Sequence, residues 1–341
     1  MLNNCQIVYH NQNCLNTKKP YAHPCRLCID ACPHQAISEY KEINPKQCTE
    51  CGVCMAVCPS DGFVDRNTDM LHNFIETSDA IILNCPQAIP AGFEIPCLGV
   101  IDRELWTTLM LAARDKEVKL YTGKCAECPD KKACIHSVRV FKEIHEDWQD
   151  HPSVLIQVSP DQGEETPLSN LTRKAEASEK GGWKKKGWEK IESILPGLTA
   201  DEAYLIPRTK QLMTKRMESN PEHKIPIPAL KINDQCTSCG VCAAICPQTA
   251  LSKKENGDEL TLVYEPYKCV RCQRCVNICN PKALSFSTKP LSHRLLTGKI
   301  LIHKGSPRHC IRCGKQVFDR SEPAMCIACA STNPNEEGFF M

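Results

Sequence analysis

Cysteine residues recur along this chain in runs with one spacing, Cys-x2-Cys-x2-Cys-x3-Cys. Three runs are complete and a fourth is shorter: Cys236, Cys239, Cys242 and Cys246; Cys269, Cys272, Cys275 and Cys279; Cys48, Cys51, Cys54 and Cys58; and Cys25, Cys28 and Cys32. Three thiolates from one tight loop and a fourth from another segment ligate a cubane [4Fe-4S] cluster, and in paired runs the last cysteine of each run ligates the other cluster. The spacing therefore predicts one-electron transfer.

The two runs between residues 236 and 279 predict two complete clusters. The expected ligand sets are Cys236, Cys239, Cys242 and Cys279 for one cluster, and Cys269, Cys272, Cys275 and Cys246 for the other. Zinc sites also use Cys-x2-Cys pairs, but a run of four that occurs twice favours iron–sulfur clusters. Asn280 separates Cys279 from Pro281, which changes the exit of the loop and leaves the ligand count unchanged.

The N-terminal runs are less regular. One [4Fe-4S] cluster is expected at Cys48, Cys51, Cys54 and Cys32. The other expected [4Fe-4S] cluster has Cys25, Cys28 and Cys58, but Ala22 stands three residues before Cys25, where a fourth cysteine is expected. We expect Cys14 to supply the missing ligand. Cys5, His23 or a three-ligand [3Fe-4S] cluster are the alternatives.

The two cysteine-rich regions resemble the bacterial two-cluster ferredoxin family. The resemblance rests on the paired runs and on repeats such as Cys32-Pro33-His34-Gln35-Ala36-Ile37 and Cys246-Pro247-Gln248-Thr249-Ala250-Leu251. It implies an α+β fold with pseudo-twofold symmetry and low-potential electron transfer in both regions.

Strand and helix patterns alternate between these regions. We expect strands over residues 80–85, 93–97, 118–121 and 154–158 and helices over 102–116 and 133–148. Asp102 is the expected N-cap of the first helix. This order predicts a small parallel sheet with crossover helices.

The same stretch has five cysteines of its own, Cys85, Cys97, Cys125, Cys128 and Cys134. They fall at the expected carboxyl ends of strands, where α/β sheets place ligands. Residues 95–102 and 121–128 resemble the delta-type electron-transfer subunits of methyl-viologen-reducing hydrogenase and heterodisulfide reductase complexes. That resemblance implies that four of the five cysteines hold a [2Fe-2S] or other iron–sulfur cluster. A zinc site, or thiols without a cluster, are the alternatives.

Two further Cys-x2-Cys pairs lie in the C-terminal tail, Cys310 with Cys313 and Cys326 with Cys329. This arrangement is typical of a zinc ribbon, and a further cluster is the alternative. We expect His303 and His309 to be surface residues rather than ligands.

Composition divides the chain into five blocks: an N-terminal module (residues 1–69), a middle block (70–158), a charged linker (159–231), a second cysteine module (232–290) and a tail (291–341). The expected fold is α+β and multidomain, with two ferredoxin-like 2[4Fe-4S] modules flanking a small parallel α/β domain and a zinc-ribbon-like tail. In the linker, Trp183-Lys184-Lys185-Lys186-Gly187-Trp188 is either a solvated helix face or a docking surface for a partner subunit or membrane headgroups.

The bulk composition favours a cytoplasmic protein. Disulfide scaffolds are usually short secreted chains, and this chain has 341 residues and no apolar signal segment at its N-terminus. Its apolar stretches are shorter than the roughly 20 residues needed to span a bilayer, so membrane association is expected only through partners. The net charge of +2 gives no indication of a nucleic-acid partner.

The sequence contains no P-loop, dinucleotide fingerprint or metalloprotease motif, so we assign no catalytic residue. The expected function is that of a polyferredoxin-like subunit passing electrons within or to an anaerobic oxidoreductase complex. The expected partners are subunits of the hydrogenase, formate dehydrogenase, heterodisulfide reductase or molybdopterin enzyme class. One alternative is a reductase whose middle block carries a redox-active cysteine or cluster. Another is a zinc- and iron-dependent assembly or sensor protein.

Overall fold

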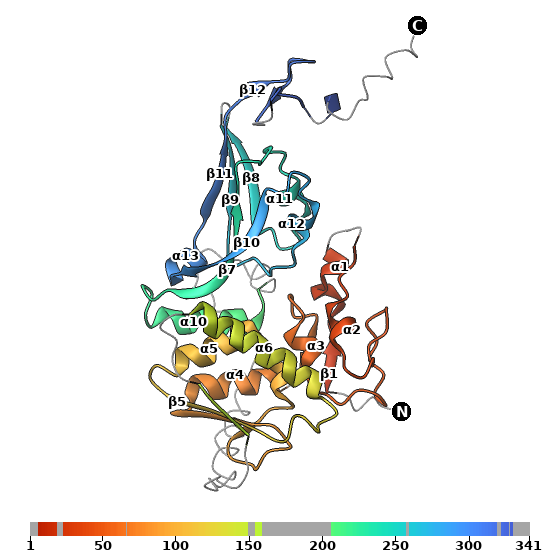
Figure 1. Cartoon of the computed structure of the whole chain (residues 1–341), viewed down its shortest axis with the longest axis vertical. Helices are drawn as coiled ribbons and strands as arrows, with labels where there is room; N and C mark the ends of the chain where they lie inside the picture. Colours follow the sequence, from red (N-terminus) through yellow and green to blue (C-terminus); the bar gives the residue numbers. More distant parts are fainter. Residues whose placement is uncertain are drawn as a thin grey trace, which may run out of the picture. The chain divides into compact units, whose positions relative to one another are not determined.

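A computed structural model describes residues 6–18, 23–65, 67–148, 154–158, 206–256, 259–318, 322–326 and 328–329. The chain divides into two compact units, Met1–Pro226 and Ile227–Met341, which Figure 1 colours from red to green and from cyan to blue. The segment from Trp183 to Trp188, with most of the expected linker, lies outside the described residues. The boundaries of the five blocks stay predictions.

Short elements around a small core form the N-terminal module. They are β1 (Ile7–Tyr9), η1 (Asn11–Asn13), α1 (Leu15–Lys18), α2 (Leu27–Ala31), α3 (Val53–Ala56) and β2 (Phe63–Asp65). β1 and β2 pair antiparallel, and their side chains Ile7 and Phe63 join a core that also contains Cys28 and Cys54. Helices of four or five residues are too short to be stable alone, so they depend on this core and on what its cysteines bind.

A four-stranded sheet is the centre of the middle block. Its strands are β3 (Ala80–Asn84), β4 (Phe93–Glu94), β5 (Glu117–Thr122) and β6 (Leu155–Val158), in the order β4-β3-β5-β6. All three pairings are parallel, which requires crossover connections. Ile81, Leu83 and Leu120 are fully buried, as is usual for a sheet covered by helices.

Helices complete the first unit. They are α4 (Thr68–Thr77), η2 (Leu98–Val100), α5 (Arg103–Ala112), α6 (Lys131–Asp147) and α10 (Arg208–Glu218). The predicted N-cap of α5 is confirmed, since Oδ1 of Asp102 accepts a hydrogen bond from the backbone N–H of Leu105 at 2.7 Å. Trp106 on α5 donates from Nε1 to Oγ of Ser137 on α6 at 2.9 Å, and Thr209 on α10 donates to Asp102 at 2.6 Å. These bonds fix the helices that carry or flank the cysteine loops.

The second unit is mainly antiparallel. Its elements are β7 (Ile225–Ile232), α11 (Val241–Ile245), β8 (Leu251–Asn256), β9 (Glu259–Tyr264), α12 (Arg274–Ile278), β10 (Leu284–Leu291), α13 (His293–Thr297), β11 (Ile300–Gly305), β12 (Arg308–His309) and β13 (Gln316–Val317). β7 pairs with β10, and β9 lies between β8 and β11. Leu260, Leu262 and Tyr264 alternate inward along β9 and are almost fully buried, the period-2 pattern of a strand with one core face.

The expectation that His303 lies at the surface is wrong. Its side chain is buried, with 8% exposed, and its Nε2 lies 2.7 Å from Oγ of Ser238. The cause is the pairing of β11 with β9, which turns alternate residues of β11 inward. His309 is exposed, as expected. No helix within the described ranges has both the length and the apolar character needed to cross a bilayer.

Candidate metal centres

Four cysteines line one cavity in the N-terminal module: Cys32, Cys48, Cys51 and Cys54. Cys32 ends α2, and the other three come from the loop and first turn of α3. Gly52 has a φ of +75°, the left-handed conformation that glycine adopts without strain, and it turns this loop around the cavity. The backbone N–H groups of Ala36 and Glu50 donate to the sulfurs of Cys32 and Cys48 at 3.3 and 3.4 Å. The structure thus brings together the four cysteines of this predicted ligand set.

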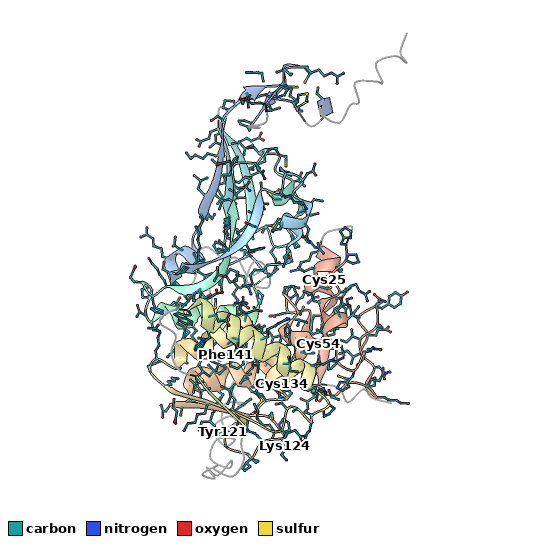
Figure 2. All side chains as sticks on the ribbon, in the orientation of Figure 1. Cys25, Cys54, Tyr121, Lys124, Cys134 and Phe141 are labelled. Atoms are coloured by element: carbon teal, nitrogen blue, oxygen red, sulfur yellow. The ribbon has the colours of Figure 1, made fainter. Side chains whose placement is uncertain are left out.

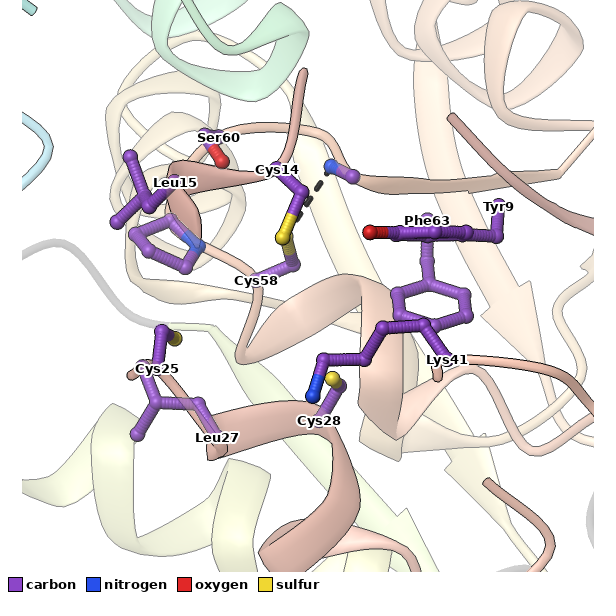
Figure 3. A pocket seen from close by; sticks show the side chains of 12 residues that line it. Tyr9, Cys14, Leu15, Cys25, Leu27, Cys28, Lys41, Cys58, Ser60 and Phe63 are labelled. Carbon is purple, nitrogen blue, oxygen red and sulfur yellow. Dashed lines mark hydrogen bonds between the residues drawn. The ribbon is translucent and has the colours of Figure 1, made fainter. Parts of the chain in front are cut away.

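A second cavity in this module is lined by Cys14, Cys25, Cys28 and Cys58 (Figure 3). Asn16 holds the Cys14 segment beside Cys25, because its side chain accepts from the backbone N–H of Cys25 at 2.7 Å and donates to its carbonyl at 3.0 Å. The N–H of Gly62 donates to the sulfur of Cys58 at 3.1 Å. Cys14 therefore lies where the run itself lacks a fourth cysteine. Cys5 lies outside the described residues.

Sequence reasoning missed a buried cation in the second cavity. The side chain of Lys41 is only 7% exposed, and its amino group points towards the sulfur of Cys28 inside the cavity (Figure 3). Burial raises the pKa of the Cys28 thiol to about 11, and the charge of Lys41 acts against that rise. Lys41 lies in a tight turn with a φ of +67°, and no sequence motif marks it as part of the cavity.

In the second unit, an open cavity is lined by Cys236, Cys239, Cys242 and Cys279. The N–H groups of Ser238 and Ala283 donate to the sulfurs of Cys236 and Cys279 at 3.4 and 3.3 Å. These four cysteines, which form one of the ligand sets predicted for the C-terminal runs, therefore surround one space.

The remaining cysteines of the paired runs are Cys246, Cys269, Cys272 and Cys275. They lie close enough together for their charges to affect the pKa values of Cys272 and Cys275. Burial raises the pKa of Cys275, and the charges of Cys269, Cys246 and Cys272 raise it further. Thiols held protonated by burial release their protons when a metal binds them. The structure therefore also brings together the second ligand set predicted for the C-terminal runs.

Four of the five middle-block cysteines gather between β3, β5 and α6. Cys134, at the N-terminal end of α6 (Figure 2), has its Sγ 3.3 Å from Sγ of Cys125. Burial is the main cause that raises the pKa of Cys134. The hydrogen bond and charge of Cys125 raise it further, as do the charges of Cys97 and Cys85. The N–H of Gly123 donates to the sulfur of Cys85 at 3.3 Å. Cys128 is half-buried in the turn that precedes α6.

The spacing between Cys125 and Cys134 limits which metal group this pair can hold. Two thiolates on one tetrahedral metal ion, with metal–sulfur bonds of about 2.3 Å, lie roughly 3.8 Å apart. Ligands of a cubane each bind a different iron atom and lie farther apart. A separation of 3.3 Å is closer to the spacing of two thiolates on one iron of a [2Fe-2S] cluster than to the wider spacing of cubane ligands.

The tail brings its four cysteines into one compact group. The sulfurs of Cys310, Cys313, Cys326 and Cys329 all lie within 4.8 Å of one another, and those of Cys313 and Cys326 are 3.7 Å apart. Gly314, with a φ of +70°, closes the first knuckle by donating to the carbonyl of Cys310 at 2.8 Å. Backbone N–H groups of Cys326 and Cys313 lower the pKa of Cys310 to about 6. Four sulfurs this close together could hold one metal ion.

Comparison with known protein families identifies the two cysteine modules. Residues 235–283 match the 4Fe-4S dicluster domain, and residues 41–63 match the 4Fe-4S binding domain. The chain carries two ferredoxin-type 4Fe-4S domains. The domain at residues 41–63 includes the loop that precedes α3, and the domain at residues 235–283 includes α11 and α12.

Two curated relatives agree with these ferredoxin-type domains. A ferredoxin of Pyrobaculum islandicum is 46% identical over 52 residues, which are 15% of this chain and 46% of the ferredoxin. An iron-sulfur subunit of the CoB--CoM heterodisulfide reductase of Methanocaldococcus jannaschii is 30% identical over 84 residues, or 20% of this chain and 13% of the relative. The chain thus spans less than half the length of either relative.

Proposed function

We propose that this iron–sulfur protein is a polyferredoxin-like subunit that conducts electrons, one at a time, within or to an anaerobic oxidoreductase complex. The observation that carries the proposal is the grouping of cysteines around separate cavities, two of them in the N-terminal module. Each group fits a cubane cluster, because four thiols converge on one space and backbone N–H groups donate to the sulfurs. When bound, the clusters supply one-electron redox chemistry.

The proposed ligand sets are those expected from the sequence. Four [4Fe-4S] clusters are assigned to Cys32, Cys48, Cys51 and Cys54; to Cys14, Cys25, Cys28 and Cys58; to Cys236, Cys239, Cys242 and Cys279; and to Cys246, Cys269, Cys272 and Cys275. In the middle block we assign a [2Fe-2S] cluster to Cys85, Cys97, Cys125 and Cys134. The tail is assigned one zinc ion. The chain's own role is to hold these groups at fixed positions.

The proposed partners are redox subunits of the hydrogenase, formate dehydrogenase, heterodisulfide reductase or molybdopterin enzyme class. The match to a heterodisulfide reductase iron-sulfur subunit supports a partner of this kind. We also propose a cytoplasmic location, since 26 cysteines require reducing conditions to remain available as metal ligands.

An anaerobic reductive titration tests the proposal. The loaded chain is titrated with a low-potential one-electron donor such as reduced methyl viologen, and the electrons taken up per chain are counted. We expect several electrons per chain and their release to an added acceptor. The Cys239→Ala and Cys48→Ala variants each lose part of this capacity, whereas the Cys128→Ala variant keeps it. A loaded chain that takes up no electrons would contradict the proposal.

The short distance between Cys125 and Cys134 supports a second candidate, a thiol–disulfide reductase in the middle block. A pair of thiols 3.3 Å apart can close to a disulfide with little movement. Mass spectrometry of the oxidised protein distinguishes the two functions. A Cys125–Cys134 disulfide in the iron-loaded protein favours the reductase, and iron bound in the middle block without that disulfide favours electron conduction.

A further inference from the structure

Asp130 joins the ligand loops of two different centres in the first unit. One of its carboxylate oxygens, Oδ1, accepts a hydrogen bond from Oγ1 of Thr49 at 2.7 Å and lies 2.7 Å from Nε2 of His34. Thr49 stands between Cys48 and Cys51, and His34 follows Cys32 by two residues. Asp130 itself lies between Cys128 and Cys134 at the start of α6. One side chain of the middle block therefore holds both cysteine segments around the Cys32 cavity.

A close backbone approach accompanies this contact. A Cβ added at Gly52 would lie 2.9 Å from Cβ of Val100, so the start of α3 packs directly on η2. Gly52 follows Cys51, and η2 follows Cys97. Two ligand-bearing segments from different blocks therefore lie against each other.

The pKa shifts of Cys97 and Cys51 agree with this packing. Burial is the main cause that raises the pKa of Cys97 to about 12, and the charges of Cys51, Asp130 and Cys125 add to it. Asp130 is also among the charges that raise the pKa of Cys51, after burial. The packing of Gly52 on Val100 is the geometric basis of the contact, and it brings the adjoining Cys51 and the Cys97 that precedes η2 towards each other, one from each centre.

We propose that this contact is an internal electron-transfer junction, in which Asp130 is the positioning residue that keeps the Cys51 and Cys97 segments together. The inference rests on the proposed function. One electron leaves the reduced centre on one side of the junction and reduces the oxidised centre on the other, with no bond made or broken and no proton required. The first electron comes from an external low-potential one-electron donor. The N-terminal module and the middle block then act as one redox unit.

Two variants of the iron-loaded full chain test the junction, and a third is the control. Asp130→Ala removes both contacts, and Thr49→Val removes one of them without touching the middle block. Glu146→Ala is the matched control, because Glu146 lies on the exposed side of the same helix α6. Iron and sulfide content are measured first, so that only fully loaded samples are compared.

The readouts are magnetic and kinetic. In the wild type and in Glu146→Ala, reducing both centres makes the middle-block EPR signal relax faster, so that it saturates at higher microwave power. In Asp130→Ala this enhancement falls, and the middle block is reduced several-fold more slowly, because the rate of electron tunnelling falls exponentially as the two centres move apart. Thr49→Val shows a smaller change in the same direction.

Equal relaxation and equal reduction rates in wild type, Asp130→Ala and Thr49→Val would overturn the junction. A wild-type chain with reducible ferredoxin-type signals but no iron in the middle block would also overturn it, while leaving electron conduction intact. The absence of every reducible signal would instead overturn the proposed function.

Discussion

The amino group of Lys41 lies beside the sulfur of Cys28, inside the cavity lined by Cys14, Cys25, Cys28 and Cys58. The cavity around Cys32 in the same module is lined by apolar residues, Thr49 and His34, with no lysine or arginine among its lining residues. A buried positive charge favours the reduced, more negative state of a cluster. The two proposed clusters of this module are therefore electrostatically unequal.

We predict that Lys41→Met lowers the midpoint potential of the cluster beside Cys28. At a fixed potential, the ratio of reduced to oxidised cluster falls by at least about tenfold, since Coulomb's law gives roughly this factor for a charge about 10 Å from the iron at an effective dielectric constant of about 20, and a charge beside a ligand sulfur is closer than that. An EPR-monitored redox titration measures the shift. Lys41→Arg keeps the charge and is the control. A Lys41→Met protein that titrates at the wild-type potential would refute this prediction.

Cys14 is predicted to be the fourth ligand of that cluster. In Cys14→Ala the site keeps only Cys25, Cys28 and Cys58, so we expect loss of one iron and a [3Fe-4S] EPR signal in the oxidised protein. His23→Ala, at the alternative ligand, serves as the control and leaves the spectrum unchanged. The assignment fails if His23→Ala produces the [3Fe-4S] signal and Cys14→Ala does not.

The tail is predicted to bind one zinc ion per chain. Four sulfurs within 4.8 Å of one another suit a closed tetrahedral site. Metal analysis should find no zinc in Cys326→Ala and an unchanged iron content, because the clusters use other cysteines. His309→Ala is the matched control, since His309 is exposed on the adjoining hairpin. Iron in place of zinc in the tail of the wild type would contradict the assignment.

Removal of all metal is predicted to make the protein sensitive to alkaline pH. Burial raises the pKa of Cys28 and Cys51 to about 11 and that of Cys97 to about 12, from a usual value of 9.0. The folded state therefore binds these protons more tightly than the unfolded state. This stability is fully present below about pH 9 and is lost as the pH rises towards 12.

Anaerobic urea unfolding between pH 7 and pH 11 measures this effect. In the loaded protein the thiolates are already deprotonated and bound to metal, so its urea midpoint should change less over the same range. A metal-free protein that is as stable at pH 11 as at pH 8 would show that these thiols do not control its stability.

The sequence predicted those features that depend on local spacing. A Cys-x2-Cys-x2-Cys loop brings three thiolates around one space by its length alone, and Asp102 caps α5 through a bond to a residue three positions away. These groupings require no knowledge of which segments meet in space. The cysteines therefore indicated the chemistry before the fold was known.

Features that depend on tertiary contacts could not be predicted. The pairing of Cys125 with Cys134 depends on where α6 begins, and the contact between Asp130 and Thr49 joins residues 81 positions apart. Lys41 faces a cavity because of its backbone conformation, for which its sequence gives no sign. The error on His303 has the same origin, since the register of β11 on β9 decides which of its residues face inward.

The central claim is that this chain binds several reducible [4Fe-4S] clusters. Iron and sulfide analysis combined with low-temperature EPR of anaerobically reconstituted protein tests it most directly. We expect about sixteen iron and sixteen sulfide per chain from four cubanes, further iron in the middle block, and several [4Fe-4S] signals on reduction. Reconstituted protein without any reducible cluster signal would contradict it.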